Sequence, residues 1–589
     1  MTRDDSAPSE TGSSETSSSE TGRSSRRSFL RASGVGALGI ATGALGAVAI
    51  GQAARPHPDS TYGFTPLKAR HEPGFDHIVV MMFENRSFDH MLGRLYTEKT
   101  VPEGQKFEGL QSGDHSNTAP DGTVVAAHVY EGTTDDIMSQ PNPDPGEYYS
   151  HVNTQLFGVV DPASNEDLSQ HPVEAPWNAP KKGQKPDMSG FVRDYIINYR
   201  LARGTDPKPE EYARVMGGFS PEMLPVLSAL AQGFGVYDHW FCAVPSQTFC
   251  NRSFFHAGTS HGFVTNVQHG GQKKWLDAPA VPTVFNRLED AGKTWRVYYD
   301  ADQVVSLTGM LHAPSIEKYW KTNFRSMEQF HKDAADGNLP DYAFIEPRMV
   351  FDHNDMHPPV SKPEVVADPD GGEPFDSAMS DMRAAEALLA EVYTSVRSGT
   401  SKKGSNAMNT LMLVTFDEHG GIYDHVPPPT ALPPTKDGEA GEMDFTFDRL
   451  GARVPTIAIS AHTAAGTVIN DVMHHGALVK TLCEQHGLAP LTQRDAAATS
   501  LHNAVNLKTP RQPALWPDVH RPYVPKNPEA GLSKPTDEKH RDRPLTAPAL
   551  GLIGLLLARY EPDAELPSSY GDAYEVLTKH GEGLFGVSD

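Results

Sequence analysis

Short runs of β-branched and aromatic residues recur along the chain and alternate with longer amphipathic segments. These runs predict strands at residues 77–83, 294–300, 341–347, 410–418 and 454–460. The apolar spacing between them predicts helices at residues 220–234, 377–398 and 475–488. Nearly continuous apolar strands that alternate with amphipathic helices are typical of a mostly parallel sheet with helices on both faces. The chain is therefore predicted to form one large α/β domain.

Long segments rich in Pro, Gly and Asp interrupt this alternation, at residues 99–187, 352–376, 427–447 and 506–545. Loops of this length in a compact domain usually serve a function. Several of them carry His beside Asp or Pro, so we expect them to form the walls of a site. A short apolar run at residues 551–560 predicts a helix too short to cross a membrane.

The first 54 residues predict a leader that precedes the folded part. Residues 1–25 are rich in Ser, Thr, Glu and Gly, a composition typical of disorder. Arg26 and Arg27 then precede a Gly/Ala-rich apolar run that ends in small residues at Ala53 and Ala54. This arrangement resembles a twin-arginine (Tat) signal peptide, so we expect the Tat export machinery to deliver the protein to the cell envelope or the medium. An uncleaved membrane anchor is the alternative, and the many Gly residues of the run disfavour it.

The net charge of −24 argues against phosphate-backbone binding as the main activity, because nucleic-acid binders need basic patches. Three cysteines, Cys242, Cys250 and Cys483, are too few for a disulfide framework or a thiolate zinc site. Cys242 and Cys250 are close enough in sequence to pair in an oxidising compartment, and two buried free thiols are the alternative.

Acidic and amide residues follow two of the predicted strands where each one ends. Glu84 and Asn85 follow the first, and Asp417 and Glu418 end the fourth. The carboxyl ends of parallel strands meet at one edge of a sheet, and oxygen ligands suit Mg²⁺, Ca²⁺, Mn²⁺ and also Zn²⁺. We therefore predict a site for one or more divalent ions. The alternative is that Glu84 and Asn85 cap a helix beginning near Ser87, and that the other pair faces water.

A hydroxyl-rich segment between residues 244 and 262 offers candidate nucleophiles at Ser246, Thr248, Ser253, Thr259 and Ser260. A hydroxyl is a weak nucleophile near neutral pH unless a metal or a base lowers its pKa, and the predicted ion would do so.

Residues for anion binding and proton transfer lie close by in the sequence. Asn251 and Arg252 carry amide and guanidinium donors that suit an anionic group. Residues 345–359 bring Glu346, His353, Asp355 and His357 together, and His is suited to protonate an alkoxide leaving group. Most of the 26 histidines are expected to be structural or solvated, so only those inside these segments receive a role.

Eight motifs occur in the order ENRSFDHMLG, MGGFSPEMLPVLSALAQGF, YDHWFCAVPSQTFCNRSFFHAGTSHG, FIEPR, NDMHPP, TFDEHGGIYDHVPPP, FDRLGARVP and LTQRD. In this order they resemble the phosphoesterase family of bacterial and plant non-specific phospholipases C and related acid phosphatases. The resemblance implies an α/β, alkaline-phosphatase-like fold. It covers residues 75–496, so we expect residues 55–589 to form a single catalytic domain with a C-terminal extension at residues 497–589.

The resemblance also implies roles for individual residues. The metal ligands would be Glu84, Asn85, Asp417 and Glu418, together with the nucleophile Thr248, for which Ser246 is the competing choice. Asn251 and His357 would contact phosphate, and His151 and His425 would belong to the same pocket. Arg252 and His353 are added as substrate-binding candidates on their own chemistry and not on the resemblance. Family members commonly have Pro where this chain has Cys250, which leaves the local turn geometry open.

Together, the residues and the resemblance predict an exported, metal-dependent phosphoric ester hydrolase of phospholipase C type. Thr248 would attack phosphorus in line and form a phosphothreonine, and His357, with His151 or His425, would protonate the leaving alkoxide. We expect at most transient contact with a membrane surface, because the extra C-terminal β domains of some secreted phospholipases C have no counterpart here.

Two other functions stay open. An acid phosphatase would use the same residues on phosphomonoesters, and an apolar groove beside Thr248, lined from residues 99–187 or 300–325, would separate the two enzymes. A non-catalytic envelope binding protein is the third reading, which the presence of Thr248 and both acidic pairs disfavours.

Overall fold

The structure is a computed structural model. It describes residues 67–68, 72–168, 172–267, 271–300, 303, 305–350, 353–359, 381–436, 438–522, 541, 545 and 547–580. All of these residues belong to one compact unit that spans residues 52–589. The predicted leader and export signal lie outside the described residues. No helix in the described part of the chain is long and apolar enough to span a bilayer.

An eight-stranded sheet has the order β13-β6-β12-β11-β1-β10-β8-β9. The strands are β1 (His77–Phe83), β6 (Gly235–Tyr237), β8 (Trp295–Tyr299), β9 (Phe324–Ser326), β10 (Tyr342–Glu346), β11 (Thr410–Phe416), β12 (Thr456–Ile459) and β13 (Thr467–Ile469). The strands from β11 to β9 run parallel, and β12 is antiparallel to both of its neighbours. The predicted mostly parallel sheet is thus confirmed, and each predicted strand is present.

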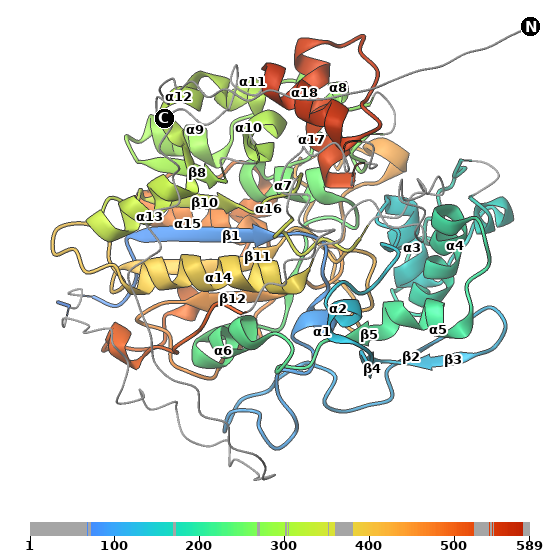
Figure 1. Cartoon of the computed structure of the whole chain (residues 1–589), viewed down its shortest axis with the longest axis horizontal. Coiled ribbons are helices and arrows are strands. Elements are labelled where there is room, and N and C mark those ends of the chain that lie inside the picture. The colour runs from blue at the N-terminus through green and yellow to red at the C-terminus, as the bar shows by residue number, and fades with distance from the viewer. Residues whose placement is uncertain are drawn as a thin grey trace, which may run out of the picture. The chain divides into compact units, whose positions relative to one another are not determined.

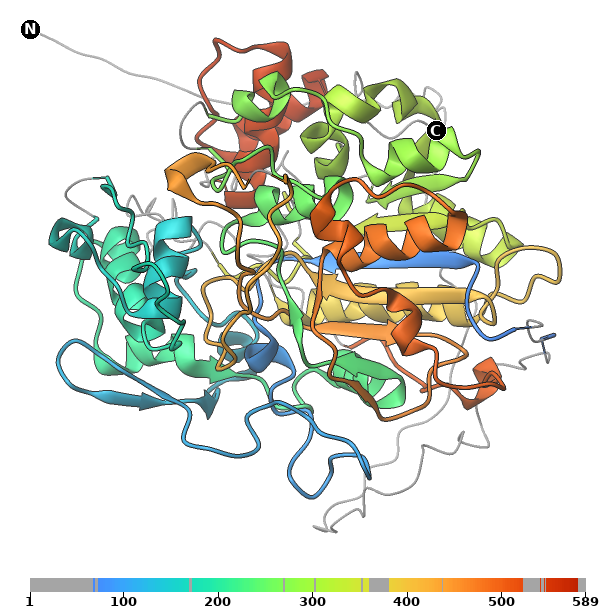
Figure 2. The ribbon, with the colours of Figure 1, turned by 180° about the vertical axis from the view of Figure 1, so that it is seen from behind.

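Helices cover both faces of this sheet (Figures 1 and 2). α14 (Met382–Arg397) and α6 (Pro225–Gly233) lie on one face, and α15 (Gly476–His486) and α7 (Thr248–Ala257) lie on the other. α6 begins at Pro225, later than predicted, and its first free N–H groups, those of Val226 and Leu227, donate to the carboxylate of Glu386 on α14. A neighbouring helix therefore caps α6.

The predicted loop at residues 99–187 contains short elements of its own. The hairpin of β2 (Ser116–Thr118) and β3 (Val124–Ala126) packs with α3 (Tyr149–Phe157) and α4 (Phe191–Arg203) around a second, smaller hydrophobic cluster. Figure 1 shows this group at the end of the sheet to which β1 points. The carboxyl ends of the strands therefore face this group.

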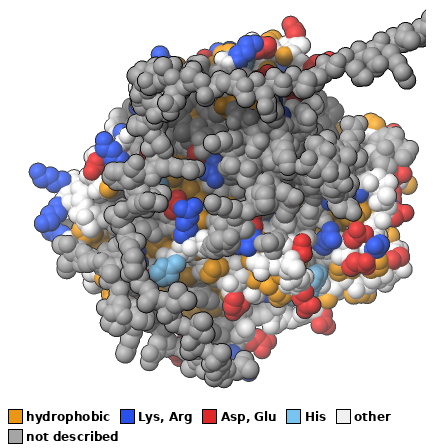
Figure 3. All heavy atoms as spheres, viewed as in Figure 1, with side chains coloured by type: hydrophobic (Ala, Val, Ile, Leu, Met, Phe, Trp, Pro, Cys, Tyr) orange, Lys and Arg blue, Asp and Glu red, His pale blue; other side chains and the backbone are white. Residues whose placement is uncertain are grey.

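The remaining short helices and strands connect these layers. They are α1 (Phe88–Met91), α2 (Thr134–Ile137), α5 (Pro209–Tyr212), α8 (Lys273–Asp277), α9 (Val284–Asp290), α10 (Leu307–Leu311), α11 (Ala313–Ile316), α12 (Trp320–Asn323), α13 (Met327–Asp336), α16 (Gln493–Ala496), α17 (Ala547–Tyr560), α18 (Tyr570–His580), β4 (His128–Val129), β5 (Gly217–Gly218), β7 (Trp240–Phe241) and β14 (Met473–His474). α17 contains the run predicted as a short apolar helix. On the face shown in Figure 3, acidic side chains gather over the end that carries α4 and α5, in keeping with the net charge of −24.

Candidate functional site

The carboxyl ends of β1 and β11 bring the two predicted acidic pairs together. The last residues of these strands are partners in the parallel register, so Glu84 and Asp417 leave adjacent strands side by side. The backbone N–H of Asn85 donates to Asp417 Oδ1 at 3.1 Å. Glu84, Asn85, Asp417 and Glu418 are all fully buried. The parallel sheet thus assembles the predicted ligand set from two distant segments.

The backbone around Asn85 is held in an unusual conformation. Asn85 has a φ of 55°, in the left-handed region. Gly420 has a φ of 64°, and a Cβ at this position would lie 2.2 Å from the carbonyl oxygen of Asn85. Only glycine fits there, so the glycine turn after Glu418 allows the two strand ends to approach each other. The predicted capping alternative is not observed, because Ser87 caps α1 and accepts from His90 N.

Thr248 contacts the first pair of predicted ligands, Glu84 and Asn85. Its Oγ1 donates to Glu84 Oε2 at 3.2 Å and lies 3.5 Å from Asn85 Oδ1. Thr248 is the first residue of α7 and is 7% exposed. The positive end of a helix macrodipole stabilises negative charge that develops nearby. The hydroxyl is therefore placed where an attacking oxygen and a phosphoryl group would be stabilised.

The other hydroxyls of this segment hold the local chain. Ser246 Oγ donates to the carbonyl of Val264, Ser253 Oγ to that of Thr259, and Ser260 Oγ to that of Phe263. Among the predicted nucleophiles, Thr248 is thus the one that faces the acidic pair.

Cys250 does not disturb the turn before α7. It lies within this helix, which is continuous from Thr248 to Ala257, and it is fully buried. Cys242, Cys250 and Cys483 are all buried free thiols, so the disulfide alternative is not observed.

Arg252 joins the two acidic pairs. Its Nη2 donates to Glu84 Oε1 at 2.5 Å, and its Nε donates to Asp417 Oδ2 at 3.2 Å. Arg252 is 1% exposed, so this contact lies inside the protein. Burial raises the pKa of Glu84. The positive charge of Arg252 opposes this shift, and the negative charge of Asp417 adds to it. Arg252, predicted to hold substrate, is thus engaged by the predicted metal ligands.

Asn251 shapes the turn before the nucleophile. Its Oδ1 accepts from Val244 N at 3.0 Å, and its Nδ2 donates to the carbonyl of Ser246 at 2.7 Å. Both ends of the amide are engaged by backbone, and the side chain is fully buried. Its predicted contact with phosphate stays a prediction, and its contribution in this structure is to position Thr248.

The donor set at the strand ends fits a hard divalent cation. Glu418 Oε2 accepts from Gly420 N at 2.8 Å, whereas its Oε1 is buried and has no hydrogen-bond partner among the described residues. Burial and the neighbouring Asp417 raise the pKa of Glu418. The Thr248 hydroxyl contacts Glu84 and Asn85, and Arg252 bridges Glu84 and Asp417, so carboxylate, amide and hydroxyl oxygens lie together at the strand ends. Such an oxygen-rich set suits Ca²⁺, Mg²⁺ or Mn²⁺ and also accepts Zn²⁺.

The loop that carries His353 and His357 is tied to the end of β1. Asp355 accepts from His353 Nδ1 at 2.9 Å and from the backbone N–H of His357 at 3.2 Å, and its carbonyl accepts from Glu84 N at 2.8 Å. His357 Nδ1 donates to the Pro358 carbonyl at 2.6 Å. Burial lowers the pKa of His357 to about 4, so the imidazole is neutral near pH 7 and its Nε2 carries a lone pair.

Glu147 belongs to the site, and sequence reasoning missed it. Asn85 Nδ2 donates to Glu147 Oε1, and Glu147 is 8% exposed. Burial and repulsion from Glu418 raise the pKa of the Glu147 carboxyl. Glu147 follows no predicted strand. The only sequence signal was its position four residues before His151 in GEYYSH.

His151 lies beside Glu147 and is held by a carboxylate. His151 Nδ1 donates to Asp194 Oδ1 at 2.8 Å, and Gln155 Nε2 donates to Asp194 Oδ2 at 2.7 Å. A Cβ at Gly146 would lie 2.3 Å from the imidazole, so the ring packs directly on the backbone next to Glu147. Asp194 is a second residue that the sequence did not reveal, because it lies on α4.

His425 belongs to a separate cluster. Its Nδ1 and Asp89 Oδ2 are 2.6 Å apart. Arg453 donates to Asp89 and Asp424, each at 2.9 Å. This buried cation already neutralises both carboxylates, so the group is a salt-bridge network and a poor metal site. In the described part of the chain, no hydrogen bond joins His425 to Thr248.

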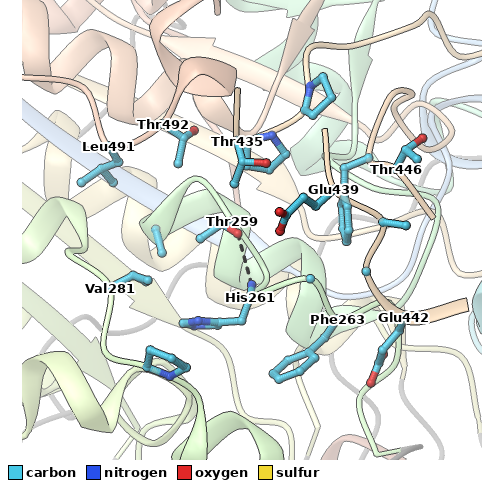
Figure 4. A pocket seen from close by; sticks show the side chains of 18 of the residues that line it. Thr259, His261, Phe263, Val281, Thr435, Glu439, Glu442, Thr446, Leu491 and Thr492 are labelled. Carbon is cyan, nitrogen blue, oxygen red and sulfur yellow. Dashed lines mark hydrogen bonds between the residues drawn. The ribbon is translucent and has the colours of Figure 1, made fainter. Parts of the chain in front are cut away.

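A cavity lies at the other end of α7. It has a volume of about 660 Å³ and is lined mainly by apolar residues, including Ala257, Phe263, Val281 and Leu491 (Figure 4). His261 lies in its wall, with its backbone N–H donating to Thr259. A helix of ten residues is about 15 Å long, so this cavity is separated from Thr248 by the length of α7. It is formed by segments other than residues 99–187 or 300–325.

Comparison with known proteins relates the chain to one family. The profile of the Phosphoesterase family matches residues 75–368 and 375–489. Non-specific phospholipase C1 of Arabidopsis thaliana is 31% identical over 465 residues, which cover 75% of this chain and 73% of that protein. Phospholipase C B of Mycobacterium tuberculosis is 25% identical over 516 residues, 80% of this chain and 85% of that protein.

A solved structure of a protein in the alkaline phosphatase superfamily, from Vibrio parahaemolyticus, is 13% identical to this chain. It covers 48% of this chain and 65% of its own, with a TM-score of 0.27.

Proposed function

The chain belongs to the Phosphoesterase family and is a hydrolase of phosphoester bonds, and from this premise we propose that it is a metal-dependent phospholipase C. The names of its relatives in Arabidopsis and Mycobacterium support a phospholipid as the substrate. The observation that carries the proposal is the contact of Thr248, the first residue of α7, with Glu84 and Asn85. A phosphatase acting on phosphomonoesters is the second candidate.

In the proposed reaction, Thr248 Oγ1 attacks phosphorus and forms a phosphothreonine. Its hydroxyl already donates to Glu84, so the proton passes to that carboxylate as the new P–O bond forms. A divalent ion held by Glu84, Asn85, Asp417 and Glu418 would lower the pKa of the hydroxyl and neutralise charge on the phosphoryl oxygens. Arg252 keeps two of these carboxylates in position.

We assign the proton donor for the leaving alkoxide to His151. Asp194 accepts from its Nδ1, which leaves Nε2 to hold the transferable proton. After donation, the unprotonated Nε2 accepts a proton from the water that hydrolyses the phosphothreonine. His357 is less suited to this role, because burial lowers its pKa to about 4 and its Nε2 is therefore unprotonated near pH 7.

We also propose that the protein is exported by the twin-arginine pathway. The support is the Arg26–Arg27 pair followed by a Gly/Ala-rich run that ends in small residues. A paired Arg26→Lys and Arg27→Lys variant should accumulate in the cytoplasm, and its export at the wild-type level would contradict the proposal.

Turnover on two substrates tests the activity. Protein that begins at residue 55 would be assayed on p-nitrophenylphosphorylcholine and p-nitrophenyl phosphate, with and without a chelator. Preference for the choline diester, loss of activity with chelator, and loss in Thr248→Ala are expected. Ser246→Ala is the matched control and should retain activity. Preference for the monoester would favour the phosphatase, and full activity of Thr248→Ala would refute the phosphothreonine.

A further inference from the structure

A second group of potential metal ligands lies beside Asn85, where two loops meet. Asp144, Glu147 and His357 each direct one ligand atom to a common point, and these atoms all lie within 4.8 Å of one another. The two loops are joined by the Asp144 N–H, which donates to the carbonyl of Pro359 at 2.9 Å. Glu147 is also held by Asn85. The group is therefore built into the protein and is distinct from the ligand set at the strand ends.

Two buried oxygens near this group lack a donor. Asp144 Oδ1 and Glu418 Oε1 are out of contact with solvent and have no hydrogen-bond partner among the described residues. Glu418 is 0% exposed. Next to burial itself, its negative charge is the largest cause of the raised pKa of Glu147. Its carboxylate also repels that of Asp144. Asp144 thus presents an unpaired buried oxygen within the group, and Glu418 adds negative charge that acts on both Glu147 and Asp144.

His357 contributes a lone pair to the same volume. Its Nδ1–H is committed to the Pro358 carbonyl, so Nε2 of the neutral ring is an acceptor. This Nε2 lies 3.6 Å from Glu147 Oε1, which is also an acceptor. Two acceptors that face each other need a proton or a cation between them. A His that donates its other N–H to a carbonyl also has the usual outer-sphere arrangement of a metal ligand.

Nearby protein cations do not occupy this volume. Arg86 is the candidate for such a cation, because its positive charge attracts the carboxylate of Asp144. Arg86 Nε donates to the Met356 carbonyl at 2.6 Å and Nη1 donates to that of Gln140 at 2.5 Å, whereas Nη2 is buried without a hydrogen-bond partner among the described residues. In the described part of the chain, no Lys or Arg forms an ion pair with Asp144, Glu147 or Glu418. Among the residues that the structure describes, the negative charge of this group is therefore left without an ion pair to Lys or Arg.

We propose that Asp144, Glu147 and His357 bind a second divalent cation beside the one assigned to the strand ends. The mixture of carboxylate oxygens and one imidazole nitrogen suits Zn²⁺ or Mn²⁺ better than Ca²⁺ or Mg²⁺. A second ion would give a phosphoryl group bound at Thr248 another positive partner.

Zinc stoichiometry tests the proposal. Protein depleted with a chelator would be reloaded with Zn²⁺, freed of excess ion by gel filtration and analysed by mass spectrometry of the metal. We expect two ions per wild-type chain and one in the Asp144→Asn, Glu147→Gln double variant. Glu103→Gln, which changes an exposed carboxylate elsewhere, is the control and should keep two. A single ion in the wild type, or two in the double variant, would overturn the proposal.

A second measurement does not depend on a variant that folds. Anomalous scattering at the zinc edge from wild-type crystals should show two peaks, one of them at bonding distance from His357 Nε2. The absence of that peak would refute the site. The metal count and the turnover assay are independent, so failure of the phospholipase assignment would leave this result unchanged.

Discussion

Thr248 Oγ1 donates a hydrogen bond of 3.2 Å to Glu84 Oε2, and the two residues are 164 positions apart in the chain. The contact joins the start of α7 to the end of β1. It depends on the parallel sheet, on the Asn251 amide that holds the preceding turn, and on the Arg252 bridge. Substitutions in this supporting structure should therefore alter the site without removing a reacting group.

Asp194→Asn should lower kcat by about two to four orders of magnitude, as expected when an imidazole loses the group that fixes its tautomer. The amide cannot stabilise an imidazolium at His151, so the pH dependence of kcat should also shift. Steady-state kinetics from pH 5 to 9 measure both effects. Asp206→Asn, an exposed carboxylate paired with Arg200, is the control. An unchanged pH profile in Asp194→Asn would contradict the assignment of His151.

Arg252→Met should destabilise the ion-free protein by about 3–5 kcal/mol, because it leaves two buried carboxylates without their cation. Thermal or urea unfolding after treatment with a chelator measures this loss. Added divalent ions should recover part of the stability, since they neutralise the same carboxylates.

Arg200→Met provides the matched control for this change. Arg200 pairs with Asp206 at the surface, where an ion pair contributes about 0–1 kcal/mol. Equal losses in the two variants would show that the Arg252 bridge adds nothing beyond a surface pair.

Gly420→Ala should distort the site as well as destabilise the fold. The new Cβ would lie 2.2 Å from the Asn85 carbonyl oxygen, so the end of β1 must move. Activity should fall by about tenfold or more, as a misplaced catalytic group implies. Gly487→Ala is a close control, because Gly487 has a similar φ of 65° but nothing within 4 Å of its Cβ position. It should cost about 1–2 kcal/mol and leave kcat unchanged.

Glu386 should make stability fall as the pH rises from about 4.5 to about 7. Burial raises its pKa to about 7 in the folded protein, against the hydrogen bonds from the N-terminus of α6. In this window the native state binds a proton that the unfolded state has released, so the free energy of unfolding decreases with pH, by up to about 3 kcal/mol. Below pH 4.5 both states are protonated and the penalty is absent.

Glu386→Gln should flatten this part of the stability profile, because the amide cannot ionise. Unfolding midpoints at pH 5 and pH 8 measure the difference, and Glu391→Gln on the same helix is the partly exposed control. An equally steep profile in Glu386→Gln would show that another group dominates.

The sequence predicted strands best where burial is complete. The run at 77–83 coincides with β1, whose residues after His77 are all buried. The helix start at 220 was wrong, because the N–H groups of α6 are satisfied by Glu386 on another helix, a contact that no local pattern contains. The loop at 99–187 was predicted to wall the site, and it does supply Glu147 and His151.

By itself, the sequence determined the α/β class, the acidic pairs at two strand ends and Thr248 as a candidate nucleophile. Periodicity, burial and residue chemistry are local properties, and the family motifs are contiguous. Only the tertiary structure decided that Arg252 bridges Glu84 and Asp417, that Asp194 supports His151, and that Glu147 joins Asn85. These are contacts between segments distant in the chain, and they depend on the strand register and on how the loops pack over the end of the sheet.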